Sequence, residues 1–125
     1  ITPVVRRCES KGILAIDAEL AALVEKARAG TLTPAEYTGA SFTISNLGSF
    51  GIEEFTAIIN PPGSAILALG KVQRTPVADD GDRVVVRSLM RATLSCDHRV
   101  IDGAVGAAFL ADLKAMFENP YAILL

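Results

Sequence analysis

Apolar and polar positions alternate in the last third of the chain. Met90, Ala92, Leu94 and Cys96 are apolar, whereas the residues between them are polar. This period of two predicts a strand with one face buried. His98, the only histidine of the chain, lies two positions beyond Cys96 and shares the apolar parity if the strand continues.

Helical spacing replaces this alternation directly after His98. Four apolar residues recur every three or four positions, namely Val105, Phe109, Leu113 and Met116. Such spacing is typical of one face of a helix. Asp102 precedes it, and aspartate caps a helix start by accepting hydrogen bonds from free backbone amides. We therefore expect His98 between a strand and a helix.

The remaining pattern predicts alternating strands and helices. We expect a strand over Thr2–Arg7, a helix over Ile13–Ala29 ended by Gly30, one helical turn over Thr33–Glu36, and strands over Ser41–Ser45, Ser64–Val72 and Arg83–Arg87. The long helix has one apolar face made of Ile13, Ile16, Leu20, Leu23 and Ala27. Pro61–Gly63 breaks the chain, and Asp79–Asp82 predicts a hairpin turn between the strands Ser64–Val72 and Arg83–Arg87. The fold class is mixed α/β.

Composition fits one domain with large interfaces. Half of the 125 residues are apolar and 21% are charged, which is ordinary for a soluble domain. The mean hydropathy of +0.39 is high for a free monomer of this size. We therefore expect part of the apolar surface to be covered by further sequence or by neighbouring subunits.

Charge and cysteine content exclude several function classes. A net charge of −2, with both signs interspersed, favours neither nucleic acid nor anionic membrane as a partner. The chain has no apolar run long enough for a membrane span, and its first residues do not resemble a signal peptide. Cys8 and Cys96 are too far apart for a short metal motif, so we expect no metal and a reducing compartment.

The expected position of His98 suits proton transfer. Carboxyl ends of strands in α/β sheets open crevices in which ligands bind. An imidazole on the apolar side of such an exit is partly desolvated, which disfavours its cation and suits a general base for a thiol or hydroxyl. The alternative interpretation is a hydrogen-bonded histidine at the edge of the core.

The segment Asp97-His98-Arg99-Val100-Ile101-Asp102-Gly103 resembles the active-site signature of the dihydrolipoyl acyltransferases, the core components of 2-oxoacid dehydrogenase complexes. Other segments resemble this family in the same order, namely Ser41–Gly48, Ile58–Pro62, Ala65–Gly70 and Asn119–Leu125. The resemblance implies a two-layer sandwich with a mixed β-sheet, the coenzyme A-dependent fold shared with chloramphenicol acetyltransferase. It also implies that residues 1–125 are the carboxyl-terminal part of one catalytic domain, with lipoyl and subunit-binding domains outside it.

The resemblance implies an activity and an assembly. An acyl group, acetyl by the likeness of Thr93–Cys96 to pyruvate-linked members, would pass between dihydrolipoamide and coenzyme A. The lipoyl group would be carried on a domain outside this chain. Homotrimers would assemble into a core of 24 or 60 subunits. The partners of this core would be the 2-oxoacid decarboxylase and dihydrolipoyl dehydrogenase components, in the bacterial cytoplasm or the mitochondrial matrix.

Residue by residue, the resemblance implies three catalytic side chains. His98 would be the base that activates the attacking thiol. Ser45, facing the histidine from an adjacent subunit of the trimer, would stabilise the tetrahedral oxyanion. Asp102 would hold the site around His98 and Arg99 as well as cap the helix. We also expect Arg99 to form a structural ion pair, and Asp97 to make local hydrogen bonds.

Coenzyme A would pass Ser45, Asn46, Gly70 and Val72. Local backbone roles remain open for all four residues. Serine and asparagine before a glycine are common at strand ends and in turns, and the end of a strand explains Gly70 and Val72 equally well.

Three other interpretations remain. Cys96 as a nucleophile with His98 as its base is one, although a cysteine within an apolar alternation more often packs as a small hydrophobe. An acetyltransferase for a small hydroxyl substrate is another, but there a second histidine precedes the catalytic one, where this chain has Asp97. The third is a non-catalytic structural core subunit, which the joint presence of His98, Ser45 and Asp102 disfavours.

Overall fold

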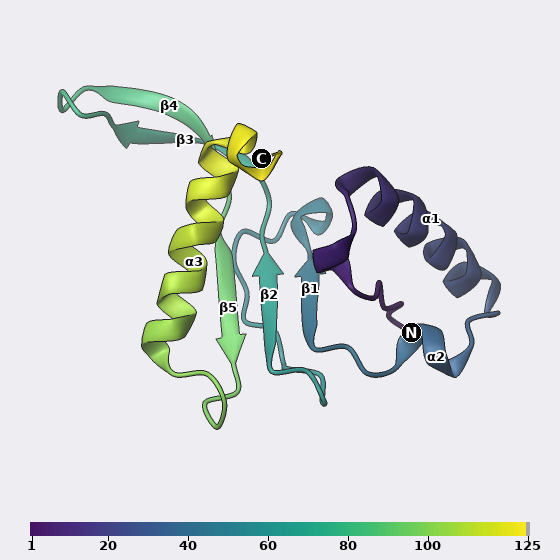
Figure 1. Cartoon of the computed structure of the whole chain (residues 1–125). Coiled ribbons are helices and arrows are strands. Elements are labelled where there is room, and N and C mark those ends of the chain that lie inside the picture. The colour runs from purple at the N-terminus through teal and green to yellow at the C-terminus, as the bar shows by residue number, and fades with distance from the viewer. Residues whose placement is uncertain (125) are drawn as a thin grey trace. The chain divides into compact units, whose positions relative to one another are not determined.

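The chain divides into two units in this computed structural model, which describes residues 1–124. The units are Ile1–Ser41 and the residues from Phe42 onward, and Figure 1 labels their elements. The first unit holds a 3-10 turn at Cys8–Ser10, the helix α1 (Ile13–Ala29) and the short helix α2 (Pro34–Tyr37). Both helices are therefore confirmed.

The ends of α1 and α2 follow from their sequence. Gly30 ends α1 with a φ of 69°, a left-handed conformation that glycine adopts without steric cost. Thr33 and Glu36 form a capping box at α2, in which the Glu36 carboxylate accepts a hydrogen bond of 2.8 Å from the Thr33 backbone amide. Of the apolar face predicted for α1, only Leu23 is fully buried, at 7% exposure.

The strand predicted over Thr2–Arg7 is wrong. Val4 donates a backbone hydrogen bond of 2.8 Å to the Glu36 carbonyl, but no strand pairs with this segment in the part of the chain that the structure describes. Arg7 ends the segment with a φ of 52°. A strand needs a continuous ladder of backbone partners, and one hydrogen bond does not supply it.

A three-stranded mixed sheet is the centre of the second unit. It has the order β1-β2-β5, with the bounds Phe42–Asn46, Ala65–Leu69 and Ala92–Cys96. β1 runs parallel to β2, whereas β5 runs antiparallel to it, as Figure 1 shows. The central strand β2 is a continuous apolar run, and its residues 65–68 are at most 5% exposed, as expected for a strand covered on both sides.

A separate hairpin follows β2, which corrects one prediction. The sheet strand ends at Leu69 instead of Val72, and a further strand, β3 (Gln73–Ala78), pairs with β4 (Val84–Leu89). β3 was not predicted from the sequence. It contains Pro76, which lacks an amide donor and is unusual within a central strand. The turn at Asp79–Asp82 is confirmed.

The helix α3 (Gly103–Glu118) runs alongside β5. Gly106 is buried against this strand, and a Cβ added to it would lie 3.3 Å from the Sγ of Cys96. Phe109 meets Phe42 of β1 with ring centroids 5.6 Å apart. One helix layer on a mixed sheet confirms the predicted two-layer α/β class. None of the helices within residues 1–124 is long and apolar enough to span a membrane.

Large apolar side chains remain exposed on the second unit. Examples from different elements are Ile44 at 61%, Phe50 at 77%, Ile58 at 91% and Phe117 at 55% exposure. The predicted face of α3 is only partly covered, since Val105 is 58% exposed. Apolar surface of this extent is typical of a contact region, and it agrees with the expectation that further sequence or neighbouring subunits cover part of the apolar surface.

Candidate active site

The loop between β5 and α3 carries His98 in a hydrogen-bonded turn. The Asp97 carbonyl accepts hydrogen bonds from the amides of Val100 at 3.0 Å and Ile101 at 2.9 Å. The Asp97 amide donates a hydrogen bond of 2.8 Å to the carbonyl of Ser64, the residue just before β2. The predicted position of His98 between a strand and a helix is thus confirmed.

The His98 side chain differs from the expectation of partial burial. It is exposed in this chain, and it lies in the turn that follows the end of β5 at Cys96. Its imidazole has no hydrogen-bond partner among residues 1–124. The alternative interpretation, a hydrogen-bonded histidine at the core edge, is therefore wrong for this chain.

Asp97 and Arg99 form an ion pair on either side of His98. The Asp97 Oδ1 atom accepts from the Arg99 amide at 3.0 Å and from Nε at 2.9 Å, and Oδ2 accepts from Nη2 at 2.7 Å. The guanidinium hydrogen bonds, followed by the amide, lower the pKa of Asp97 to about 2. The structure thus names the partner of Arg99 that sequence analysis left open, and the local hydrogen bonds expected of Asp97 are confirmed.

Asp102 caps α3 as predicted. Its Oδ1 atom accepts a hydrogen bond of 2.9 Å from the amide of Val105. The residue therefore begins the helix four positions after His98. Its expected second role, holding the geometry around His98, stays a prediction.

Ser45 and Asn46 lie at the carboxyl end of β1. Ser45 is half-buried, whereas Asn46 is exposed. The Asn46 Oδ1 atom accepts a hydrogen bond of 2.9 Å from the Gly48 amide, which is a local turn of the kind that asparagine commonly makes. The Leu47 amide donates 3.1 Å to the Leu69 carbonyl and keeps this turn beside the end of β2.

Gly70 lies at the same end of the sheet and has a clear packing role. Its amide donates 2.9 Å to the Arg91 carbonyl, and an added Cβ would lie 1.9 Å from the Glu53 carbonyl oxygen. Only glycine permits this approach of the two backbones. Val72, by contrast, is 65% exposed. Ser45 and Asn46 thus end β1, and Gly70 and Val72 follow the end of β2.

One chain does not bring Ser45 and His98 together. Ser45 pairs with Ala68, and Ala68 pairs with Thr93 in β5. Because β5 runs the opposite way, the chain leaves it at the end where β1 and β2 begin (Figure 1). The three residue steps from Thr93 to Cys96 span about 10 Å, and the turn follows. The two side chains are too far apart to act on one atom within one chain.

Cys96 contributes to packing in this structure. It is half-buried, and its Sγ lies close to Gly106 of α3. The strand does not continue to His98, since β5 ends at Cys96, so strand parity does not align the two side chains. The geometry therefore does not pair a cysteine nucleophile with His98.

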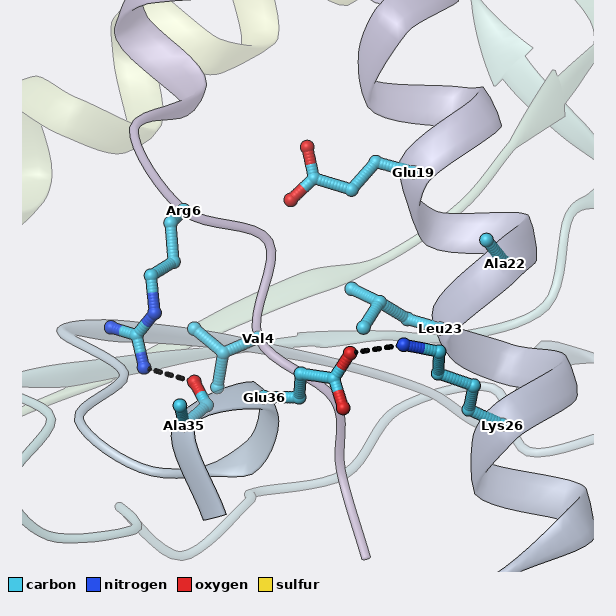
Figure 2. A pocket seen from close by; sticks show the side chains of 8 residues that line it. All are labelled: Val4, Arg6, Glu19, Ala22, Leu23, Lys26, Ala35 and Glu36. Carbon is cyan, nitrogen blue, oxygen red and sulfur yellow. Dashed lines mark hydrogen bonds and ion pairs between the residues drawn. The ribbon is translucent and has the colours of Figure 1, made fainter. Parts of the chain in front are cut away.

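Neither of two cavities includes His98. The amino-terminal unit has a cavity of about 320 Å³, and its lining residues are Val4, Arg6, Glu19, Ala22, Leu23, Lys26, Ala35 and Glu36 (Figure 2). Its charged groups already bind one another or the backbone: Lys26 pairs with Glu36 at 2.6 Å, Glu19 with Lys11, and Arg6 donates to the Ala35 carbonyl at 2.6 Å. The Lys26 ammonium, followed by the Thr33 amide and hydroxyl, lowers the pKa of Glu36 to about 2. We assign no ligand to this cavity.

A second cavity, of about 560 Å³, lies between α3 and the base of the β3–β4 hairpin. Its apolar lining comes from Leu89, Met90, Leu110, Leu113 and Phe117. Ion pairs stand at its rim, with Lys71 3.3 Å from Glu53 and Lys114 3.8 Å from Glu118. The sequence did not predict this cavity, because its place depends on where the hairpin leaves the sheet.

Comparison with known proteins decides the family. The 2-oxoacid dehydrogenases acyltransferase (catalytic domain) family matches residues 1–125. The chain belongs to this family. The dihydrolipoyllysine-residue acetyltransferase component of the pyruvate dehydrogenase complex of Rickettsia bellii is 46% identical over 125 residues, which are 100% of this chain and 30% of that protein. The mitochondrial counterpart of Caenorhabditis elegans is 46% identical over 126 residues, 100% of this chain and 25% of that protein.

Solved structures of the family share the fold. The cubic core of a pyruvate dehydrogenase multienzyme complex has a TM-score of 0.90 and 43% identity, over 98% of this chain and 50% of that one. The dihydrolipoamide acetyltransferase of Azotobacter vinelandii has a TM-score of 0.90 and 44% identity, with the same coverage. That structure was used to study a serine, a histidine and an asparagine in the catalytic mechanism. The chain thus spans about half the length of these solved chains.

Proposed function

We propose that this chain is part of a dihydrolipoyllysine acetyltransferase, which transfers an acetyl group between dihydrolipoamide and coenzyme A in the core of a pyruvate dehydrogenase complex. The observation that carries the proposal is an exposed His98 with no partner within residues 1–124, held in a hydrogen-bonded turn of the family signature. The identity of 46% with acetyltransferase components over the whole chain supports it.

His98 acts as the base in this reaction. It takes the proton from the coenzyme A thiol, whose sulfur attacks the thioester carbonyl of acetyl-dihydrolipoamide. A carbon–sulfur bond to coenzyme A forms, and the carbon–sulfur bond to the dihydrolipoyl arm breaks. His98 then returns the proton to the departing sulfur. Nothing is oxidised or reduced, so the reaction needs no further reactant.

Ser45 stabilises the oxyanion from a second copy of the chain. The register of the sheet supports this assignment, because Ser45 and His98 of one chain lie at opposite sheet ends. The Azotobacter vinelandii study concerns a histidine and an asparagine four positions apart, the spacing of His98 and Asp102. We therefore assign His98, Ser45 and Asp102 to the catalytic site.

Coenzyme A passes the carboxyl ends of β1 and β2 in this proposal. Ser45, Asn46, Gly70 and Val72 lie there. Asn46 and Gly70 shape the backbone of this end, as their contacts support, whereas Ser45 and the exposed Val72 are open to a substrate. The lipoyl group arrives on a domain outside this chain.

The assembly follows from the same family relation. Residues 1–125 form the carboxyl-terminal part of one catalytic domain, and homotrimers of that domain build a core of 24 or 60 subunits that binds the decarboxylase and dihydrolipoyl dehydrogenase components. The exposed apolar side chains of the second unit supply contact surface for it. The bacterial and mitochondrial relatives support the cytoplasm or the mitochondrial matrix as its location.

The test is acetyl transfer by the complete protein. We expect transfer from acetyl coenzyme A to dihydrolipoamide, faster than from succinyl or isobutyryl coenzyme A, and a loss of about 10²- to 10⁴-fold in His98→Ala. Cys96→Ala is the matched control. Because Cys96 packs against α3, this substitution should leave turnover nearly unchanged. An assembled protein without transfer would support the structural core subunit instead.

A further inference from the structure

Asp97 makes hydrogen bonds through its amide, its carbonyl and both carboxylate oxygens. Its amide donates to Ser64, its carbonyl accepts from the amides of Val100 and Ile101, and both carboxylate oxygens accept from Arg99. These contacts hold the backbone immediately before and after His98. The imidazole between them is exposed and has no partner within residues 1–124.

We propose that the Asp97–Arg99 ion pair is a positioning device for the His98 base. This inference rests on the proposed acetyl transfer. Since no side chain among residues 1–124 bonds the imidazole, its place within this chain is set by the backbone that carries it. Asp97 and Arg99 act through that backbone and are positioning residues.

The geometry of the pair suits this role. Arg99 presents its amide and its guanidinium to the same carboxylate, at 3.0 Å and at 2.7 to 3.2 Å. A bidentate contact fixes direction as well as distance. A base must lie within about 2.6 to 3.2 Å of the proton that it removes, and a misplacement of about 1 Å costs on the order of a hundredfold in rate.

The hairpin turn offers a matched control. Asp79 Oδ1 accepts from the amides of Gly81 and Arg83 at 2.9 Å each, and Oδ2 accepts from the Arg83 Nε at 3.0 Å. The two pairs also resemble each other in exposure, since the arginines are 89% and 82% exposed and the aspartates 22% and 12%. Asp79 is remote from His98 in the chain and shapes only the turn of the β3–β4 hairpin.

The experiment compares Asp97→Asn with Asp79→Asn in the complete, assembled protein. We measure kcat and the KM for coenzyme A and for dihydrolipoamide, together with the thermal unfolding midpoint. We expect Asp97→Asn to lower kcat by roughly ten- to a hundredfold with both KM values within about twofold of wild type. Asp79→Asn should keep kcat, with a similar change of midpoint.

Arg99→Gln and Arg99→Lys complete the test. Arg99→Gln removes the exposed guanidinium but keeps the hydrogen bond from the residue 99 amide to the Asp97 carboxylate. If Asp97→Asn does not assemble, the kcat of Arg99→Gln therefore decides whether the ion pair positions His98. Lysine keeps the positive charge but lacks the planar guanidinium that makes a bidentate contact. The kcat of Arg99→Lys should therefore lie between those of Arg99→Gln and wild type.

Two results overturn the inference in distinguishable ways. An active wild type with unchanged kcat in Asp97→Asn and Arg99→Gln, or with equal losses in Asp79→Asn, removes the positioning role and leaves the proposed function intact. A wild-type protein that transfers no acetyl group removes both.

Discussion

Gly70 lies where the end of β2 meets the segment that contains Glu53. The Gly70 amide binds the Arg91 carbonyl, and the neighbouring Lys71 amide binds the Ile52 carbonyl at 2.8 Å. Three stretches of backbone therefore converge on a residue that has no side chain. At this position the size of one side chain decides whether the sheet end closes.

Gly70→Ala should destabilise the fold. Its Cβ would lie 1.9 Å from the Glu53 carbonyl oxygen, and the shift that relieves this clash costs about 1 to 3 kcal/mol of unfolding free energy. Gly103→Ala is the control, because an added Cβ there has no heavy atom within 4 Å. Denaturant unfolding of both variants measures the difference, and equal stability would contradict the packing role.

Glu36 is the residue whose titration should show in the pH dependence of stability. The Lys26 ammonium, then the Thr33 amide and hydroxyl, lower its pKa from 4.5 to about 2. A carboxyl with a lowered folded pKa stabilises the fold above its unfolded pKa and loses that contribution as the pH falls through its folded pKa. The contribution of Glu36 is thus complete above pH 4.5 and disappears towards pH 2.

Glu36→Gln should flatten that dependence. Between pH 4.5 and 2 the unfolding midpoint of the variant should fall less than that of wild type. Circular dichroism melts across this range measure both proteins. Asp97 titrates in the same range in both, so the difference between them carries the test.

At the scale of elements, the β5–α3 connection is the best-defined part of the site. Asp97 closes the turn after β5, and Asp102 begins α3. The two aspartates lie on either side of His98 in the chain and have different tasks. This connection follows from neighbouring residues, which is why the sequence predicted both the strand exit and the cap.

Asp102→Ala should lower the unfolding free energy by about 1 kcal/mol, because the Val105 amide loses its acceptor. Asp102→Asn should cost far less, since asparagine caps helices about as well as aspartate. Thermal or denaturant unfolding compares the two variants. Equal losses would show that the charge of Asp102, and not its cap, stabilises the helix start.

At the scale of the whole molecule, strand direction decides how the site is built. The antiparallel β5 leads to His98 at one sheet end, and the parallel β1 leads to Ser45 at the other. A second copy must therefore supply Ser45 if both residues act on one thioester. The proposed catalytic unit is an interface.

Mixed assemblies test this arrangement directly. Assemblies of His98→Ala subunits alone, or of Ser45→Ala subunits alone, are impaired. In a mixed assembly, an interface is intact where the Ser45→Ala subunit supplies His98 and the His98→Ala subunit supplies Ser45. Random assembly of equal amounts should restore about a quarter of wild-type activity. Activity that stays at the average of the two variants would place both residues in one subunit.

The sequence by itself determined the local parts of this protein. The helix over Ile13–Ala29, the turn at Asp79–Asp82 and the cap at Asp102 were all predictable, because caps, periodicity and turn residues act among near neighbours. Motif resemblance selected His98, Ser45 and Asp102, and these assignments await their tests. The packing role of Cys96 was already the favoured interpretation of the sequence. The partner of Arg99 was not predicted, although Asp97 lies only two residues away.

Only the tertiary structure decided how distant segments pair. Thr2–Arg7 has the residues of a strand but no ladder partner within residues 1–124, and β3 leaves the sheet although β2 precedes it closely. Strand order, direction and register arise from hydrogen bonds between residues far apart in the chain. For the same reason, the placement of Ser45 and His98 at opposite sheet ends could not be read from their spacing.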